Sequence, residues 1–452
     1  MRLLWSISLV VLFFISLELT LNEIVPNEPS WKLRGYQSVE AYYAQSPAHF
    51  ETENETGLCK THSDLTKGKD SSHMAMQPQR FPCKPISQRI VTLGGSSIQG
   101  YGLPFSHTLA SQLQEQLSQM GSTVDVINAG VAGYNSLQIR RMLSEVWALE
   151  PDILILYTGH NDYVYYPVIE QLLNDNPSFH LIRKGGRRLA IWRGLKALLL
   201  HTEWIKPPPS LTPPLESPSF DRQAKAAFNQ LSLPKAQTVQ ALEQLQTQQR
   251  QAEETIFRFI QKNIRDIANQ ATLNQCKLLL IGPVSRLDSP PVDGIIWNTL
   301  SQNELDAFWP LWEDLLQNTP SFNDSKWAEA LRIAPRYAPL AHLYAQAAYQ
   351  AGENETAIQY WTRAQEDSPP TRRIRAGNAM ADWIVHIGKE LDVPTIDPRK
   401  PFQQAAKVNG IPAGTLFLDS LHFSVKGNAL LTALSLDRIK KEAWISKPNS
   451  LH

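Results

Sequence analysis

Short apolar segments alternate with amphipathic ones along this chain, and this alternation constrains its fold more than any other feature. Apolar runs at 89–95, 124–130 and 152–159 are separated by stretches with helical spacing at 104–120 and 136–150. A uniformly apolar run is typical of a strand that is covered on both faces. Strands and helices in this strict order predict an α/β fold whose strands form a parallel sheet with right-handed crossovers.

The same pattern returns later in the chain. A long amphipathic stretch at 239–267 precedes a further buried-strand signature at 276–283. Residues 376–397 have the pattern of a helix followed by a strand, and 425–443 that of a closing helix. The α/β segments together amount to about 220 residues, which suits one domain. Lys plus Arg and Asp plus Glu both number 43, so no basic excess indicates a nucleic-acid partner.

The remaining sequence divides into segments of different character. Six prolines between Pro207 and Pro218 are typical of a linker or an extended loop. The predicted organisation is an N-terminal hydrophobic segment (1–21), an irregular segment (22–86), the first part of the α/β domain (87–200), a Pro-rich linker (201–235), the second part of the domain (236–289), a helical insert (290–375) and the C-terminal part of the domain (376–445).

The insert contains an internal repeat. Three pairs of identical residues are each 34 residues apart, namely Trp327 and Trp361, Ala330 and Ala364, and Pro335 and Pro369. This period resembles that of tetratricopeptide (TPR) repeats, which are helix pairs that bury their faces by stacking. Because fewer than three such repeats rarely form a stable unit by themselves, we expect the TPR-like insert to pack on the main domain. The resemblance also implies a possible role for the insert in binding a protein partner.

The N-terminal segment is a candidate membrane element. Fifteen uncharged, mostly apolar residues run from Leu3 to Leu17 after Arg2. As a helix they rise about 22 Å, which is marginal for a bilayer core of about 30 Å. We predict an uncleaved signal anchor or, alternatively, a signal peptide, although no A-x-A-like cleavage site follows. The charge distribution places the bulk of the chain outside the cytoplasm (periplasmic, extracellular or luminal), secreted if the segment is cleaved.

The three cysteines exclude a disulfide scaffold. In an oxidising compartment Cys59 and Cys83 could pair and leave Cys276 single, while three free thiols are the alternative. The histidines show no close metal-ligand spacing, and the chain has neither an H-E-x-x-H nor a C-x-x-C motif. We therefore expect neither a metal nor another cofactor.

Four short polar blocks lie at predicted strand ends. They cover residues 93–102, 127–136, 157–163 and 419–428. Each block alone is typical of an ordinary turn or helix cap. In an open parallel sheet, however, ligands bind outside the carboxyl ends of the strands. The order and location of the four blocks therefore predict one shared site.

Together the blocks resemble the motifs of the SGNH (GDSL-type) hydrolase superfamily. That family has a nucleophilic Ser after the first strand, a Gly after the second, an Asn after the third, and an Asp and a His three apart near the C-terminus. The matching residues here are Ser96, Gly133, Asn161, Asp419 and His422. The resemblance implies a flavodoxin-like, three-layer fold and a hydrolase of O-acyl esters, for example of carbohydrates or lipids.

The chemistry of these residues agrees with that assignment. A serine hydroxyl needs an adjacent base to become a nucleophile, and the neutral imidazole of His422 can take its proton. Asp419 can accept from the other ring nitrogen and fix the tautomer. The backbone N–H groups of Ser96 and Gly133 and the amide of Asn161 would form the oxyanion hole.

Two features of the motifs leave alternatives open. Gly95 stands where the family has Asp, so the turn before the nucleophile must be held differently. Ser97, which follows Ser96 directly, is the alternative nucleophile. His160 within the Asn161 block either lines the pocket or is an ordinary loop residue.

The sequence therefore predicts an extracytoplasmic serine esterase that works through an acyl-enzyme on Ser96. An O-acyltransferase would use the same residues, with a sugar hydroxyl in place of water. The alternative from another class is a binding or assembly protein, in which the TPR-like insert is the working part and the SGNH-like domain is inactive.

Overall fold

The computed structural model describes residues 48–166 apart from 54, 55, 69 and 73, and residues 169, 236, 238–408 and 415–445. The predicted membrane segment (1–21) and the Pro-rich linker (201–235) lie outside the described residues. Among the helices that are described, none combines the length and apolar composition that a membrane span requires.

A five-stranded parallel sheet forms the centre of the described domain. Its strands are β4 (Arg89–Gly94), β5 (Asp125–Gly130), β6 (Ile153–Tyr157), β7 (Lys277–Ile281) and β8 (Thr395–Ile396). They lie in the order β5-β4-β6-β7-β8, and all pairs are parallel. The second strand, β5, lies on one side of the first strand, β4, and the later strands follow on the other side, as in flavodoxin-like folds. The predicted α/β sheet is therefore confirmed.

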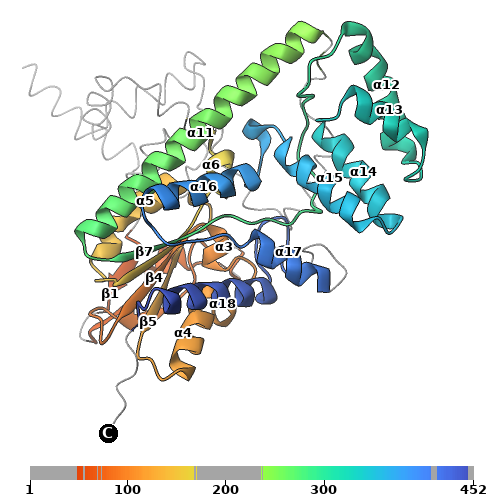
Figure 1. The fold of residues 1–452 in the computed structure, drawn as a ribbon. Coiled ribbons are helices and arrows are strands. Elements are labelled where there is room, and N and C mark those ends of the chain that lie inside the picture. The colour runs from red at the N-terminus through yellow and green to blue at the C-terminus, as the bar shows by residue number, and fades with distance from the viewer. Residues whose placement is uncertain are drawn as a thin grey trace, which may run out of the picture. The chain divides into compact units, whose positions relative to one another are not determined.

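Helices cover both faces of this sheet and give three layers (Figure 1). One face carries α5 (Ser136–Trp147), α11 (Val239–Leu273) and α16 (Asn378–Glu390). The other carries α4 (Leu109–Gln119), α17 (Arg399–Val408) and α18 (Val425–Lys441). The helices of the two layers bury both faces of each central strand, and the side chains of a strand point alternately to one layer and the other. In β6, for example, Leu154 and Leu156 face the first layer, and Ile153 and Ile155 face the second.

Of the segment 22–86 expected to be irregular, residues 22–47 lie outside the described residues, and the part from residue 48 contains regular structure. An antiparallel sheet forms from β1 (Phe50–Thr52), β2 (Leu58–Thr61) and β3 (Arg80–Pro82), and a 3₁₀ turn, η1, covers Ser63–Leu65. Strands of three or four residues are too short to produce a recognisable alternation. Cys59 and Cys83 form a disulfide beside this sheet, while Cys276 is free and buried.

Arg89, the first residue of β4, connects this small sheet to the main one. Its guanidinium is fully buried and donates to the carbonyl groups of Pro82, Cys83 and Leu149. The carboxylate of Asp125 lies 3.2 Å away and balances the charge. Burial of a guanidinium is costly unless its charge is paired and its donors are hydrogen-bonded, and here both terminal nitrogens are.

The segment predicted as an insert is helical. Its helices are α12 (Gln302–Asn318), α13 (Ser325–Ile333), α14 (Ala338–Gln350) and α15 (Asn354–Glu366). Trp327 and Trp361, one pair of the repeat, are both buried. Leu242 near the N-terminus of α11 shares a core with the first helices of the insert, so the insert packs on the main domain as expected. Its relationship to TPR repeats stays a prediction.

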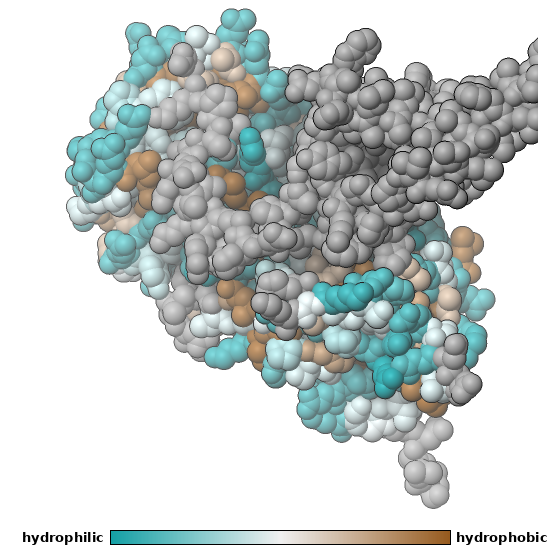
Figure 2. Space-filling view, turned by 180° about the vertical axis from the view of Figure 1, so that it is seen from behind, coloured by the Kyte–Doolittle hydropathy of each residue, from teal (hydrophilic) through white to brown (hydrophobic). Residues whose placement is uncertain are grey.

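The large hydrophobic side chains exposed on the described surface are Ile86, Met120, Leu273, Leu418 and Val425. In the view from behind, hydrophobic residues occur in small groups among hydrophilic ones (Figure 2). Isolated apolar side chains are ordinary on protein surfaces.

The disulfide is expected to stabilise the N-terminal sheet. It joins residues 24 apart, and on the chain-entropy model replacing both cysteines by serine lowers the free energy of unfolding by about 3 kcal/mol. Urea unfolding of the Cys59→Ser, Cys83→Ser variant beside the wild type measures this. A wild type with the same midpoint with and without reductant would contradict the prediction.

Candidate active site

Three of the polar blocks meet at one edge of the sheet because of the strand register. Gly94 at the end of β4 pairs with Gly130 of β5 and with Tyr157 of β6, so the three strands end at the same level. The loops that follow carry Ser96, Gly133 and Asn161, all partly exposed. Ser96 begins the short helix α3 (Ser96–Gln99), and Asn161 lies in α6 (His160–Val164).

The fourth block, just before α18, brings Asp419 and His422 to the same edge. The Oγ atom of Ser96 lies 2.7 Å from Nε2 of His422. Nδ1 of His422 lies 2.6 Å from Oδ2 of Asp419. Asp419 and His422 are buried, whereas Ser96 is partly exposed. The structure therefore joins the three predicted triad residues in one hydrogen-bonded chain.

Asp419 is held as a carboxylate. Burial raises its pKa, but the charge of His422 and the hydrogen bonds to the carboxylate outweigh this, so the pKa lies below its usual value. The backbone N–H groups of Leu421 and His422 both donate to Oδ1 at 2.9 Å. An ionised Asp419 accepts a hydrogen bond from the Nδ1–H group of His422 and leaves Nε2 as the acceptor for the Ser96 hydroxyl.

The structure distinguishes Ser96 from the alternative, Ser97. The Ser97 hydroxyl is buried and donates to the carbonyl of Leu421 at 3.2 Å. Ser96, not Ser97, therefore faces His422.

The predicted oxyanion donors come from the loops at the same sheet edge. Gly133 has a φ of +79°, a conformation that favours glycine. Within the described part of the chain, the N–H groups of Ser96 and Gly133 donate to no other protein group. One N–H of the Asn161 amide donates to the carbonyl of Tyr134 at 2.9 Å, and the amide has a second N–H. Within the described residues, these N–H groups are thus available as the three predicted oxyanion donors.

Gly95, the departure from the family motif, has a physical reason. A Cβ atom at this position would lie 2.7 Å from Nδ2 of Asn161 and 3.1 Å from the carbonyl oxygen of Tyr134. The glycine thus leaves room for the Asn161 amide to approach the start of α3.

Two supporting residues were not anticipated from the sequence. Asn128, buried in β5, donates to the carbonyl of Ile98 at the end of α3 and accepts from the N–H of Gly130. The ring of Tyr101 stacks on His422 with centroids 4.1 Å apart. Both residues lie in the polar blocks at 127–136 and 93–102. A single sequence, however, does not distinguish residues that make such contacts from ordinary turn residues.

The N-terminal segment supports the loops of the site from outside the main sheet. The carbonyl of Ala75 accepts from the N–H of Ala132, next to Gly133. Nε2 of His49 lies 2.7 Å from the Tyr134 hydroxyl. The segment expected to be irregular therefore contacts the loop that presents an oxyanion donor.

His160 does not line the site. It is buried, and burial together with the charges of His422 and Arg375 lowers its pKa to about 3. Nδ1 accepts from the backbone N–H of Ala376 at 2.9 Å, and Nε2 lies 2.7 Å from the Tyr157 hydroxyl. His160 is therefore a neutral structural residue.

A cavity of about 580 Å³ lies near the same sheet edge, beyond the end of β7. Its lining includes Val284 after β7, Thr356 of α15, and Phe402 and Phe417, which belong to the core of the second layer. Ser96, Asp419 and His422 do not line it. Among the described residues, no three His, Cys, Asp or Glu side chains gather as a metal site.

Asp162, beside Asn161, gives a prediction about pH. It is fully buried and accepts from the Ser136 hydroxyl at 2.6 Å, and burial raises its pKa from 3.8 to about 6 despite the hydrogen bonds. Its neutral form favours the fold below pH 3.8, and this contribution is lost as the pH rises through about 6. From pH 4 to 7 the wild type should lose up to about 3 kcal/mol relative to Asp162→Asn.

Urea unfolding of both proteins at pH 4, 5.5 and 7 measures this difference. Parallel pH dependences of the two proteins would show that Asp162 is not perturbed by burial.

Comparisons with known proteins agree with this geometry. Residues 92–241 match the model of the GDSL-like Lipase/Acylhydrolase family. None of the curated proteins searched matches the chain. The matched residues include Ser96, Gly133 and Asn161, while Asp419 and His422 lie beyond them.

Several solved structures are similar at low identity. An acetyl xylan esterase, AlAXEase, is 11% identical, with 78% of this chain and 99% of that chain covered and a TM-score of 0.34. The esterase EstA from Pseudoalteromonas sp. is 12% identical, with 79% and 99% covered and a TM-score of 0.34. A GDSL-like lipase from Bacteroides thetaiotaomicron is 11% identical, with 78% and 89% covered and a TM-score of 0.33.

The family match over residues 92–241 and the four motif blocks that meet at one sheet edge together support the SGNH (GDSL-type) hydrolase superfamily for the α/β domain.

Proposed function

We propose that the protein is a serine esterase that hydrolyses carboxylic (O-acyl) esters through an acyl-enzyme on Ser96. The observation that carries the proposal is the continuous contact from Ser96 Oγ through His422 to Asp419. It supplies the three things that a serine nucleophile needs, namely a base at hydrogen-bond distance, a fixed tautomer of that base and a buried anion behind it.

The reaction follows from these positions. His422 Nε2 takes the hydroxyl proton as Ser96 Oγ attacks the ester carbonyl carbon. The resulting oxyanion accepts hydrogen bonds from the N–H groups of Ser96 and Gly133 and from the Asn161 amide. The protonated His422 then gives its proton to the departing alcohol, and the acyl-enzyme forms. Water, deprotonated by the same nitrogen, attacks the acyl-enzyme and releases the carboxylic acid.

The position of the enzyme in the cell is part of the proposal. We place the esterase outside the cytoplasm, anchored or secreted through its N-terminal segment. The disulfide between Cys59 and Cys83 supports this location because such bonds persist mainly in oxidising compartments.

The geometry favours an enzyme over an inactive binding domain. A domain without catalytic demand has no need to keep Ser96 within 2.7 Å of His422 or to keep Ser96 accessible to solvent. A transferase would use the same residues, so water and a sugar acceptor must be compared in the assay.

The direct test is ester hydrolysis by the wild type and by Ser96→Ala. With p-nitrophenyl esters of increasing chain length, Ser96→Ala should lower kcat/KM by about 10⁴-fold or more, because the nucleophile is lost. Ser97→Ala is the matched control and should retain most activity, since its hydroxyl faces Leu421. A folded wild type that turns over no ester, or full activity in Ser96→Ala, would contradict the proposal. Product analysis with a sugar acceptor distinguishes a transferase.

Gly95→Ala tests the oxyanion hole. The added Cβ would meet Nδ2 of Asn161 at 2.7 Å, so the amide must move away from its present position. Since removal of a whole oxyanion donor costs about 10²–10³-fold in kcat, we expect a loss of about tenfold for a displaced one. Steady-state kinetics measures this, with KM nearly unchanged. An unchanged kcat would show that Asn161 does not stabilise the transition state.

A further inference from the structure

The chain returns from the helical insert to the α/β domain directly behind the oxyanion hole. After α15 it passes through the 3₁₀ turn η3 (Pro370–Arg372) and then through residues 373–376, called here the return segment, before α16 begins. The return segment contacts α6, the helix that carries Asn161, at two points.

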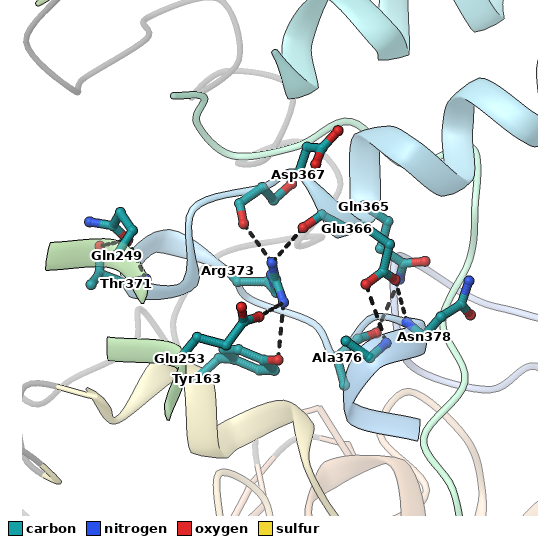
Figure 3. Close-up of polar contacts among 12 residues, drawn as sticks. Tyr163, Gln249, Glu253, Gln365, Glu366, Asp367, Thr371, Arg373, Ala376 and Asn378 are labelled. Carbon is teal, nitrogen blue, oxygen red and sulfur yellow. Dashed lines mark hydrogen bonds and ion pairs between the residues drawn. The ribbon is translucent and has the colours of Figure 1, made fainter. Parts of the chain in front are cut away.

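The first contact is made by Arg373. Its side chain is only 2% exposed. One terminal nitrogen donates to the Tyr163 hydroxyl at 3.0 Å and to the Glu253 carboxylate at 3.1 Å. The other donates to the carbonyl groups of Glu366 and Ser368 at the end of α15. Figure 3 shows the guanidinium between Tyr163 and Glu253 on one side and the end of α15 on the other.

The second contact is made by the backbone of Ala376. Its N–H donates to Nδ1 of His160 at 2.9 Å. Asn161 therefore lies between two residues of α6, His160 and Tyr163, that the return segment holds.

The short helix α6 depends on such contacts. It has five residues, and its N-cap, Gly159, offers no side-chain cap. A single helical turn is unfavourable by itself because nucleation fixes several dihedral angles for very few hydrogen bonds. The position of the Asn161 amide is thus set by what holds α6 from outside.

The acidic residues around Arg373 come from different helices, which fits a rigid connection between these helices and the return segment. Glu253 comes from α11, while Glu366 ends α15 and accepts from the N–H groups of Asn378 and Ala379 at the start of α16 (Figure 3). The planar fork of Arg373 can serve acceptors on opposite sides at once, which a lysine ammonium at the end of a flexible stem cannot.

We propose that Arg373 is a positioning residue for ester hydrolysis. Through Tyr163 it holds α6, and with the Ala376–His160 bond it keeps the Asn161 amide aimed at the oxyanion. The helical insert, which ends at this joint, is thereby coupled to the catalytic centre. The inference rests on the proposed esterase activity.

Arg373→Lys tests the inference, since it keeps the buried charge but loses the fork. A small displacement of a catalytic group can cost up to about 10²-fold in rate, so we expect kcat to fall about tenfold while KM changes less than about threefold. Tyr163→Phe removes only the hydroxyl and should lower kcat by about threefold. If Arg373→Lys does not fold, the more conservative Tyr163→Phe variant tests the proposal instead.

Thr371→Val is the matched control. The Thr371 hydroxyl lies in η3, directly before the return segment, and donates its hydrogen bond to Oε1 of Gln249 on α11. We expect wild-type kcat in this variant. A rise in KM with unchanged kcat in Arg373→Lys, or an equal loss of kcat in Thr371→Val, would overturn the proposal.

Hydrogen–deuterium exchange gives a readout that needs no activity. The amides of residues 159–166 should exchange faster in Arg373→Lys than in the wild type, and at the wild-type rate in Thr371→Val. Unchanged exchange in Arg373→Lys would overturn the coupling. If the wild type proved inactive on every ester, the proposed function would fail, while exchange would still decide whether the return segment holds α6.

Discussion

The hydrogen bond between Ser96 and His422 joins residues that are 326 positions apart, and the rest of the structure serves to make it possible. Ser96 follows β4, the first strand of the main sheet, and His422 precedes α18, the last helix of the domain. Parallel pairing of β4 with β5 and β6 brings three loops to one level, and α18 packs against α4 in the second layer below them. The contact therefore reports the correct assembly of the entire α/β domain.

Segments outside the main sheet contact the loops of the proposed oxyanion hole. His49, just before β1, and Ala75, between β2 and β3, contact the loop that carries Gly133. The return segment holds α6 on the other side through Arg373 and Ala376. Oxyanion donors must be fixed before the reaction because reorienting them during it would cost free energy. In the proposed mechanism, both segments would therefore help to fix the oxyanion donors.

The sheet and the triad could be predicted because their signals are local. Uniformly apolar strands, helical spacing and four short blocks in order lie in contiguous sequence, and the family match confirms the superfamily. Other features depend on contacts between distant residues. The strands at 50–82 are too short to show an alternation of apolar and polar residues. The pairing of Cys59 with Cys83 depends on their proximity in space, which the local sequence does not show. Nothing in the local sequence shows that Arg373 meets Tyr163, 210 residues earlier.

The most direct measurement of the central claim is the location of a covalent adduct. After treatment with a fluorophosphonate, intact mass and peptide mapping of the wild type should show one adduct, on Ser96. The adduct should be absent from His422→Ala, in which no base takes the hydroxyl proton. An adduct on Ser97 or another residue, or labelling that is equally fast without His422, would contradict the account of Ser96 as a nucleophile activated by His422 and Asp419.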